Sequence, residues 1–204
     1  MAVVCVFGSS SDAIPQRYLD LAHEVGYELA RRGHSVVTGG GSVSVMGAVA
    51  RAARAGGATT VGVIPEVLMG YEIADRDAEL VVVDTMRERK AEMEHRADAF
   101  LTLPGGIGTL EELLEIWTAR TLRMHDKPVV VLDPDDAYAP LRAQIAQLID
   151  RGFARASIND ALVWATTARS AVDLVEAGLR LVEPPVGTAA PPPPTPEEVL
   201  ESEP

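Results

Sequence analysis

Metal ligands and disulfide partners are scarce in this sequence. Its 204 residues include one cysteine, Cys5, and four widely separated histidines, which are His23, His34, His95 and His125. A single cysteine cannot close a disulfide within the chain, and the histidines lack the short spacing that zinc sites use. We therefore expect no disulfide framework, no metal site and no other cofactor.

Long apolar segments are also absent. No run approaches the roughly 18–20 residues that a membrane-spanning helix needs, and no basic segment precedes an apolar stretch as in a secretion signal. Hydrophobic residues make up 47% and charged residues 24% of the chain, which is ordinary for a globular protein. These features predict a cytoplasmic protein that contacts no membrane.

Positive charge is the third shortage. The formal net charge is −12, and five glutamates follow the last basic residue, Arg180, so the tail carries −5 and the body −7. An acidic body without a basic run argues against binding to duplex nucleic acid, which requires neutralised phosphates. Only Lys90 and Lys127 are lysines, which leaves few candidates for chemistry that needs a lysine imine.

Strand-length and helix-length apolar patterns alternate along the chain. The expected strands are residues 2–7, 35–38, 60–64, 80–84, 99–103, 129–133 and 161–165, and the expected helices are about 15–32, 45–56, 86–97, 109–123, 136–150 and 169–182. Several strands are apolar on both faces, which is typical of a parallel sheet covered by helices. The alternation predicts one α/β domain over residues 1–182, an open, doubly wound, mainly parallel sheet of about seven strands flanked by helices.

Two segments fall outside this pattern. Residues 65–78 are too polar and irregular for a helix of the usual length, and we interpret them as a loop or short helix over one edge of the sheet. Residues 183–204 hold 8 of the 14 prolines and no aromatic residue, so they cannot bury enough apolar surface to offset the cost of ordering. We interpret them as an acidic, disordered tail, with a polyproline partner-binding motif as the alternative.

Three glycine-rich segments directly follow expected strands. They are Gly8-Ser9-Ser10, Gly39-Gly40-Gly41-Ser42 and Pro104-Gly105-Gly106-Ile107-Gly108-Thr109. In a doubly wound sheet all three lie at the carboxyl edge, where ligands bind. Glycine lets the backbone approach a ligand closely, and the first-turn N–H groups of a helix attract anions. The segments indicate a nucleotide or sugar-phosphate site, although the dinucleotide fingerprint G-x-G-x-x-G and the P-loop motif are both missing.

Two motifs separated by a strand are more specific. The first is Asp84-Thr85-Met86-Arg87-Glu88-Arg89-Lys90-Ala91-Glu92-Met93, and the second, Pro104 to Glu112, has the form P-G-G-x-G-T-x-x-E. The pair resembles the LONELY GUY (LOG) family of cytokinin riboside 5′-monophosphate phosphoribohydrolases, whose members are often labelled lysine decarboxylase-like. The similarity extends from Val3 to about Phe153, and it includes Gly39-Gly40-Gly41, Met46-Gly47, Gly62-Val63-Ile64-Pro65 and His125-Asp126-Lys127-Pro128.

The resemblance implies a Rossmann-like homodimer that hydrolyses the N-glycosidic bond of an N6-modified adenosine 5′-monophosphate to the free base and ribose 5-phosphate. It implies Arg89, Glu112 and Glu111 as catalytic residues. The substrate-binding residues expected from the resemblance and the glycine segments are Gly8, Ser9, Gly40, Gly41, Met46, Glu72, Lys90, Gly105, Gly106, Ile107, Gly108, Thr109, Leu110 and Thr118. Arg87 stands where the family commonly has histidine, and Ser44-Val45-Met46-Gly47 replaces its Gly-Leu-Met-Gly, so the base preference stays open.

Carboxylates and an arginine suit this reaction. Breaking an N-glycosidic bond builds an oxocarbenium-like ribose, which a carboxylate can stabilise while it orients water. We expect Glu111 and Glu112 in the first turn of a helix, where the dipole keeps a carboxylate ionised, with Glu112 as the main catalytic group and Glu111 as a substrate contact. Arg89 could anchor the nucleotide or the departing base, and the N–H groups of the glycine loop would hold the phosphate.

Each of these residues also has a structural interpretation. Thr109 and Glu112 match a helix capping box, which needs no catalytic role. Arg89 and Lys90 could form a solvated helix face. Core packing or another structural role is the alternative for Thr118 and the expected role of Met86, Met93 and His125.

Three other functions are considered beside the phosphoribohydrolase, and two of them stay open. One is a broader nucleosidase that acts on nucleotide 5′-monophosphates, and another is a nucleotide-binding module without catalysis. Lysine decarboxylation is the third, and we reject it because a pyridoxal phosphate enzyme needs an internal lysine imine and only two lysines exist.

Overall fold

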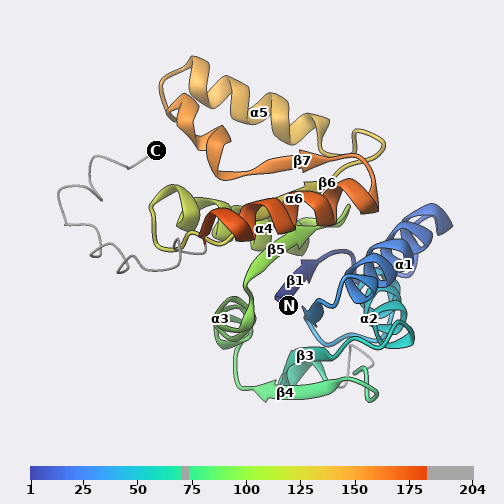
Figure 1. Ribbon diagram of the computed structural model, residues 1–204. Coiled ribbons are helices and arrows are strands. Elements are labelled where there is room, and N and C mark those ends of the chain that lie inside the picture. The colour runs from blue at the N-terminus through green and yellow to red at the C-terminus, as the bar shows by residue number, and fades with distance from the viewer. Residues whose placement is uncertain (70–73, 183–204) are drawn as a thin grey trace, which may run out of the picture.

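A computed structural model describes residues 1–69 and 74–182 of the chain (Figure 1). Its strands are β1 (Val3–Phe7), β2 (Ser35–Thr38), β3 (Thr60–Pro65), β4 (Glu79–Val83), β5 (Ala99–Thr102), β6 (Val129–Leu132) and β7 (Val163–Ala165). Its helices are α1 (Gln16–Arg31), α2 (Ser44–Ala55), α3 (Met86–Arg96), α4 (Ile107–Thr121), α5 (Ala139–Asp150) and α6 (Ala168–Val182), with short 3-10 helices η1 (Glu66–Leu68) and η2 (Ala156–Ala161). The seven expected strands are all present, each within about two residues of its expected limits.

The strands form one sheet in the order β4-β3-β2-β1-β5-β6-β7, and every neighbouring pair is parallel. From β1 the chain moves outward to β4, then returns to place β5 on the other side of β1. The direction of winding therefore reverses between β1 and β5. In open α/β sheets ligands bind outside the carboxyl ends of the strands at such a switch point. The doubly wound α/β fold is confirmed.

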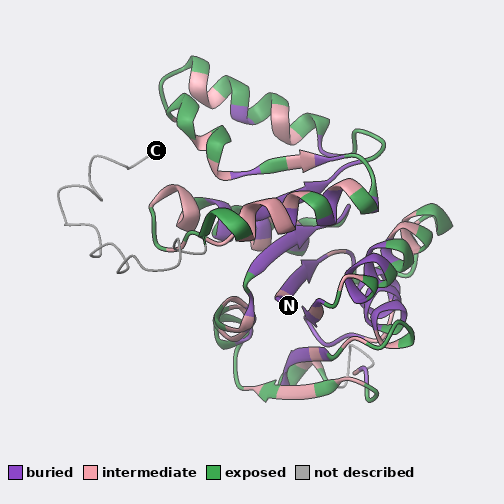
Figure 2. Cartoon of the chain, viewed as in Figure 1, coloured by how far each residue is buried: buried purple, intermediate pink, exposed green. Residues whose placement is uncertain are grey.

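Helices cover both faces of the sheet. One apolar cluster joins alternate strand residues such as Val4 and Val6 to α1, α2 and α6. The other joins the intervening residues, such as Cys5 and Phe7, to α3, α4 and α5. Because successive side chains of a strand point to opposite faces, the apolar run of β1 supplies both layers. Figure 2 shows the result as a buried centre of strands within more exposed helices.

The segment after β3 and the start of α4 can be compared with the structure expected for them. The segment after β3 is irregular as expected, with only the short helix η1 before residues 70–73, which the structure does not describe. Helix α4 begins at Ile107, two residues earlier than expected, and this shift changes the interpretation of Thr109 and of the two glutamates. Among the described residues, no helix has both the length and the apolar character that crossing a membrane demands.

Candidate active site

A cavity of about 360 Å³ opens at the carboxyl end of the sheet, beside the switch point between β1 and β5. It is bounded by the loop after β1, the start of α2, η1, the start of α3 and the first two turns of α4. The lining residues are Gly8, Ser9, Ser10, Ser11, Met46, Leu68, Met86, Arg89, Gly106, Ile107, Gly108, Thr109, Glu111 and Glu112. The fold therefore brings the two motifs of the sequence to one cavity.

The loop after β1 is fixed by the start of α2. The Val45 main-chain N–H donates to the carbonyl oxygen of Ser9 at 3.2 Å, and the Ser44 hydroxyl donates to the carbonyl oxygen of Ser11 at 2.7 Å. Ser44 adopts a left-handed backbone conformation with φ 53°, which is costly for a residue with a side chain. These bonds hold Ser9 against the cavity, which Met46 of α2 also lines.

The glycine loop runs directly into α4, whose N-cap is Gly106 and carries no side-chain cap. The N–H groups of the first turn face outward at the positive end of the helix dipole, an arrangement that binds anions. Thr109 is the third residue of this helix and is buried. The capping-box interpretation of Thr109 and Glu112 is therefore wrong, because Thr109 does not occupy the N-cap.

The same shift moves Glu111 and Glu112 into the second turn of α4, and the first turn contains no acidic residue. The expectation that both carboxylates lie in the first turn is wrong. The helix dipole acts mainly within the first turn, so it contributes less to keeping these groups ionised. Both glutamates nevertheless line the cavity.

Arg89 is buried, with 5% of its surface exposed, so its interpretation as part of a solvated helix face is wrong. Its Nη2 donates to the carbonyl oxygen of Gly39 at 2.7 Å, and its Nε donates to the carbonyl oxygen of Val63 at 3.2 Å. Arg89 thus crosses the ends of β2 and β3 and reaches the cavity from α3. A side chain at position 39 would collide with the guanidinium, which explains the glycine there.

Lys90, the next residue, bridges α3 and α4. Its Nζ pairs with the Glu111 carboxylate and with Glu115 Oε2, the latter at 2.6 Å. Burial lowers the pKa of Lys90, but the hydrogen bonds to Glu111 and Glu115 outweigh it and raise the pKa above the ordinary value. Lys90 therefore stays charged and holds Glu111, while Lys90 itself does not line the cavity.

Tyr138 is a contributor that the sequence analysis missed. The Tyr138 hydroxyl donates to the carbonyl oxygen of Leu103 at 2.8 Å and also bonds with the main chain of Gly105. Burial is the largest cause of its raised pKa, so the phenol stays protonated. No motif marks this residue, because it lies 35 positions from Leu103 and meets the glycine loop only through the pairing of β5 with β6.

The remaining expected residues take different places. Gly40 and Gly41 contact the chain after residue 73, since the carbonyl of Gly40 accepts the Asp75 N–H at 2.9 Å and Gly41 bridges to Ala74. Gly105, Leu110 and Thr118 also lie outside the lining, with Leu110 against the core and Thr118 exposed. Glu72 lies outside the described residues. The lining residues that were not expected are Ser10, Ser11, Leu68 and Met86.

The two methionines of α3 lie in different environments. Met93 is in the core at 1% exposure, as expected, but Met86 is 46% exposed and lines the cavity. The expectation that Met86 packs in the core is wrong, because it is the first residue of the helix and lies beyond the edge of the sheet. Thr85 caps this helix by accepting the Glu88 N–H at 3.1 Å, which fixes where the motif begins.

His125 has a structural environment. Its Nε2 lies 3.1 Å from the carbonyl oxygen of Ile116, and its ring packs against Phe100 with centroids 5.5 Å apart. Burial lowers the pKa of His125, which favours the neutral ring. Within the described ranges, no group of three or more histidine, cysteine, aspartate or glutamate side chains is placed to hold a metal ion.

Comparison with known proteins fits this geometry. The family model described as "Possible lysine decarboxylase" matches residues 46–175. Proteins named cytokinin riboside 5′-monophosphate phosphoribohydrolase from Mycobacterium marinum and Mycobacterium tuberculosis are each 52% identical, over 78% and 76% of this chain and 86% and 83% of theirs.

A solved molybdenum cofactor binding protein from Rippkaea orientalis shares the fold. It has a TM-score of 0.67 and 20% identity over 86% of this chain and 96% of its own. The matched family region contains both motifs and most of the cavity, and the named relatives cover more than three quarters of the chain. The chain belongs to the lysine decarboxylase-like family that includes these phosphoribohydrolases, which is the LOG family.

Proposed function

We propose that the chain hydrolyses the N-glycosidic bond of adenosine 5′-monophosphates, including N6-modified ones, to the free base and ribose 5-phosphate. The observation that carries this proposal is one cavity in which an uncapped helix N-terminus lies beside Arg89, Glu111 and Glu112. The names of relatives at 52% identity support the same reaction. The substrate needs an anion site next to a carboxylate and a group that binds the base, and this cavity contains candidates for all three.

The phosphate would bind at the start of α4. The N–H groups from Gly106 to Thr109 are not used by a side-chain cap, and the positive end of the helix dipole adds to their attraction for an anion. With the phosphate there, the ribose would extend toward the second turn of the same helix. Glu111 and Glu112 lie on that turn and line the cavity.

The reaction forms a bond between water oxygen and the anomeric carbon while the bond to the base nitrogen breaks. The electron pair of the broken bond leaves with the base, which finally takes up a proton derived from the attacking water. A carboxylate beside the anomeric carbon stabilises the positive charge that develops on the ribose and orients the water. We assign this role to Glu112.

Glu112 is the last position of the P-G-G-x-G-T-x-x-E motif, and its neighbour Glu111 is held by Lys90. We assign Glu111 to substrate contact. Arg89, held in a fixed direction by Gly39 and Val63, would contact the base or the sugar with the guanidinium edge that faces the cavity.

The test is product release. Purified protein is incubated with AMP and with N6-isopentenyladenosine monophosphate, and the base is followed by chromatography. Release of base and ribose 5-phosphate from both, faster with the modified nucleotide, is the expected result. Equal release from several nucleotide 5′-monophosphates would favour a broader nucleosidase, and tight binding without release would favour a non-catalytic nucleotide-binding module.

Lysine decarboxylation finds no support in the environment of the two lysines. Lys90 is paired with Glu111 and Glu115, and Lys127 donates to the carbonyl oxygen of Glu94 at 2.7 Å. Neither lines the cavity that contains the glycine loop before α4. Adding pyridoxal phosphate is expected to produce no imine absorbance band.

We also propose that the chain acts as a cytoplasmic homodimer with a single domain over residues 1–182. Large exposed apolar side chains at the start of α3 and on α4 support the dimer, since Met86 is 46%, Ile107 85% and Leu114 40% exposed. Exposed apolar groups of this size are typical of contact surfaces between proteins. Sedimentation analysis checks the dimer, and Ile107→Glu is expected to shift the protein toward the monomer.

A further inference from the structure

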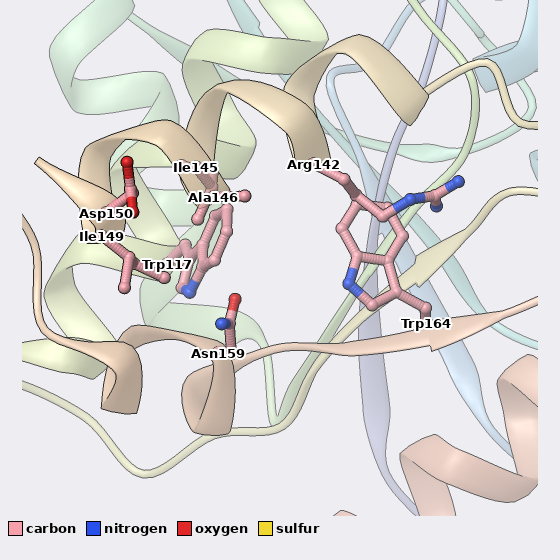
Figure 3. A pocket seen from close by; sticks show the side chains of 8 residues that line it. All are labelled: Trp117, Arg142, Ile145, Ala146, Ile149, Asp150, Asn159 and Trp164. Atoms are coloured by element: carbon pink, nitrogen blue, oxygen red, sulfur yellow. The ribbon is translucent and has the colours of Figure 1, made fainter.

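Both tryptophans of the chain line a second cavity, here called the tryptophan pocket, which lies between α4, α5, η2 and β7 (Figure 3). Its volume is about 360 Å³ and its lining residues are Trp117, Arg142, Ile145, Ala146, Ile149, Asp150, Asn159 and Trp164. It shares no lining residue with the cavity at the carboxyl end of the sheet. The proposed reaction uses none of these side chains.

The aromatic walls of the tryptophan pocket are held in place. Trp117 is 3% exposed, and its Nε1 donates to the carbonyl oxygen of Ile158 at 2.8 Å. The guanidinium of Arg142 lies 4.7 Å from the centre of the Trp164 ring, and the Tyr138 ring packs at 6.1 Å. The two indoles lie on opposite sides of the pocket in Figure 3. Such fixed walls lose little entropy when a ligand binds.

Two polar side chains face this pocket without a protein partner. Asn159 projects from η2 toward the space between the two indoles, and Asp150 lies at the end of α5 (Figure 3). Within the part of the chain that the structure describes, neither side chain makes a hydrogen bond or an ion pair. Their oxygens and the amide N–H groups can therefore bond to a ligand.

Charge and size limit what the tryptophan pocket can hold. The one cation in its lining, Arg142, is already bound by Asp133 at 2.7 Å and Asp136 at 2.5 Å, and Asp150 adds a further negative charge. A phosphorylated ligand would be repelled, whereas a neutral one would not. The volume lies near the lower limit of ligand cavities, about 300–1,000 Å³, which favours a small compound over a peptide.

We propose that the tryptophan pocket binds a free 6-aminopurine, a neutral planar base with an exocyclic amino group beside a ring nitrogen. Indole surfaces provide stacking for any such base. The Asn159 amide can both accept from the amino group and donate to the adjacent ring nitrogen, the two-bond pattern by which asparagine recognises adenine. If the proposed reaction is right, this ligand belongs to the class of its product, and only that last link rests on the proposed function.

Tryptophan fluorescence tests the proposal directly, because both tryptophans of the chain line the pocket. Adenine is titrated with excitation at the red edge of tryptophan absorption, where adenine does not absorb. We expect saturable quenching by adenine, weaker binding of unsubstituted purine, and no saturable quenching by ribose 5-phosphate. Asn159→Ala is expected to weaken the binding of adenine about tenfold and to remove the preference for adenine over purine.

Two substitutions on α5 give a matched pair. Ala146 lines the pocket, and Ala143 is exposed on the same helix outside the lining. Ala146→Phe is expected to abolish quenching, whereas Ala143→Phe keeps it with a similar melting temperature. Loss of quenching in Glu112→Gln with retention in Ala146→Phe would place adenine in the other cavity and overturn the proposal. Absence of saturable quenching in the unmodified protein would overturn it as well, whatever the catalytic assays show.

Discussion

The two ends of the sheet use arginine in different ways. At the amino end, Arg32 contacts three carboxylates, with Glu28 at 2.6 Å, Asp173 at 2.5 Å and Glu176 at 3.1 Å. At the carboxyl end, the carbonyl oxygens of Gly39 and Val63 set the direction of Arg89. The first arrangement fastens α1 to α6, and the second aims a guanidinium at a cavity. The burial of an arginine is therefore a poor guide to its role, and its partners are a better one.

Cavity size is also a poor guide to the place of the reaction. The amino end has the larger cavity, about 670 Å³, and Arg32 and Glu176 are among its lining residues. The cavity of the proposed reaction has about 360 Å³. What distinguishes the smaller one is an uncapped helix N-terminus beside two glutamates. The chemistry follows the carboxyl ends of the strands, where the loops and helix N-termini of this fold gather.

The largest expected effect is on Glu112. Glu112→Gln removes the charge that stabilises the developing ribose cation, so we expect the rate of base release to fall about 100-fold or more. Rate and melting temperature measured together check this.

Glu111→Gln is the matched control for Glu112, one position away on the same turn. We expect a smaller loss of rate, because Glu111 is assigned to substrate contact and not to the reacting carbon. Full activity in Glu112→Gln with a large loss in Glu111→Gln would reverse the assignment of the two residues. Full activity in both variants would remove the proposed mechanism.

Substitution of Arg89 and of Arg32 gives the next largest effects. Arg89→Ala leaves two carbonyl groups without their donor, so we expect the free energy of unfolding to fall by about 2–4 kcal/mol, together with a loss of activity. Arg32→Ala leaves three carboxylates close together, and we expect about 1–3 kcal/mol of lost stability. Urea unfolding measures the loss of stability of each variant. Activity assays calculated per folded molecule measure the loss of catalysis separately. Comparable losses of activity from both would contradict the distinction between the two ends.

Tyr138→Phe tests the support of the glycine loop. It removes the hydroxyl that donates to the Leu103 carbonyl and bonds with the main chain of Gly105, while the ring keeps its packing. We expect KM for the nucleotide to rise about tenfold and kcat to change less, because the loop binds the phosphate and does not take part in bond breaking. An unchanged KM would show that the loop keeps its position without Tyr138. Tyr18→Phe, whose hydroxyl bonds with Asp135 on the surface, serves as the control.

The sequence predicted the larger features well and the contacts between distant segments poorly. The doubly wound parallel sheet and the meeting of the glycine segments at its carboxyl edge follow from apolar runs and glycine motifs, which are local signals. The environment of Arg89 could not be predicted, since it depends on Gly39 and Val63, which reach the guanidinium only once β2 and β3 are paired. Tyr138 was missed for the same reason. The start of α4 was misplaced because Gly106, rather than Thr109, is its N-cap.

A smaller effect concerns acid stability at the amino end. Hydrogen bonds from Arg31 and then Arg32 lower the pKa of Glu28 from its ordinary 4.5 to about 2. A depressed carboxyl pKa contributes stability that is fully present above pH 4.5 and is lost as the pH falls toward 2. Unfolding midpoints of the unmodified chain should therefore decline across this window, and Glu28→Gln should decline less steeply. Parallel decline of the two proteins would contradict the role of Glu28.

The smallest expected effect is that of removing the tail. The described chain ends at Val182, which lines the cavity at the amino end, together with Met1 and Ala2 before β1. The cavity of the proposed reaction lies at the opposite end, and each of its lining residues precedes Leu113. Truncation after Glu183 removes four of the five tail glutamates and no lining residue of any described cavity. Rate, melting temperature and sedimentation should all stay close to those of the full chain. A loss of activity would instead assign the proline-rich segment a part in the catalytic unit, and a loss of dimer alone would assign it to the interface.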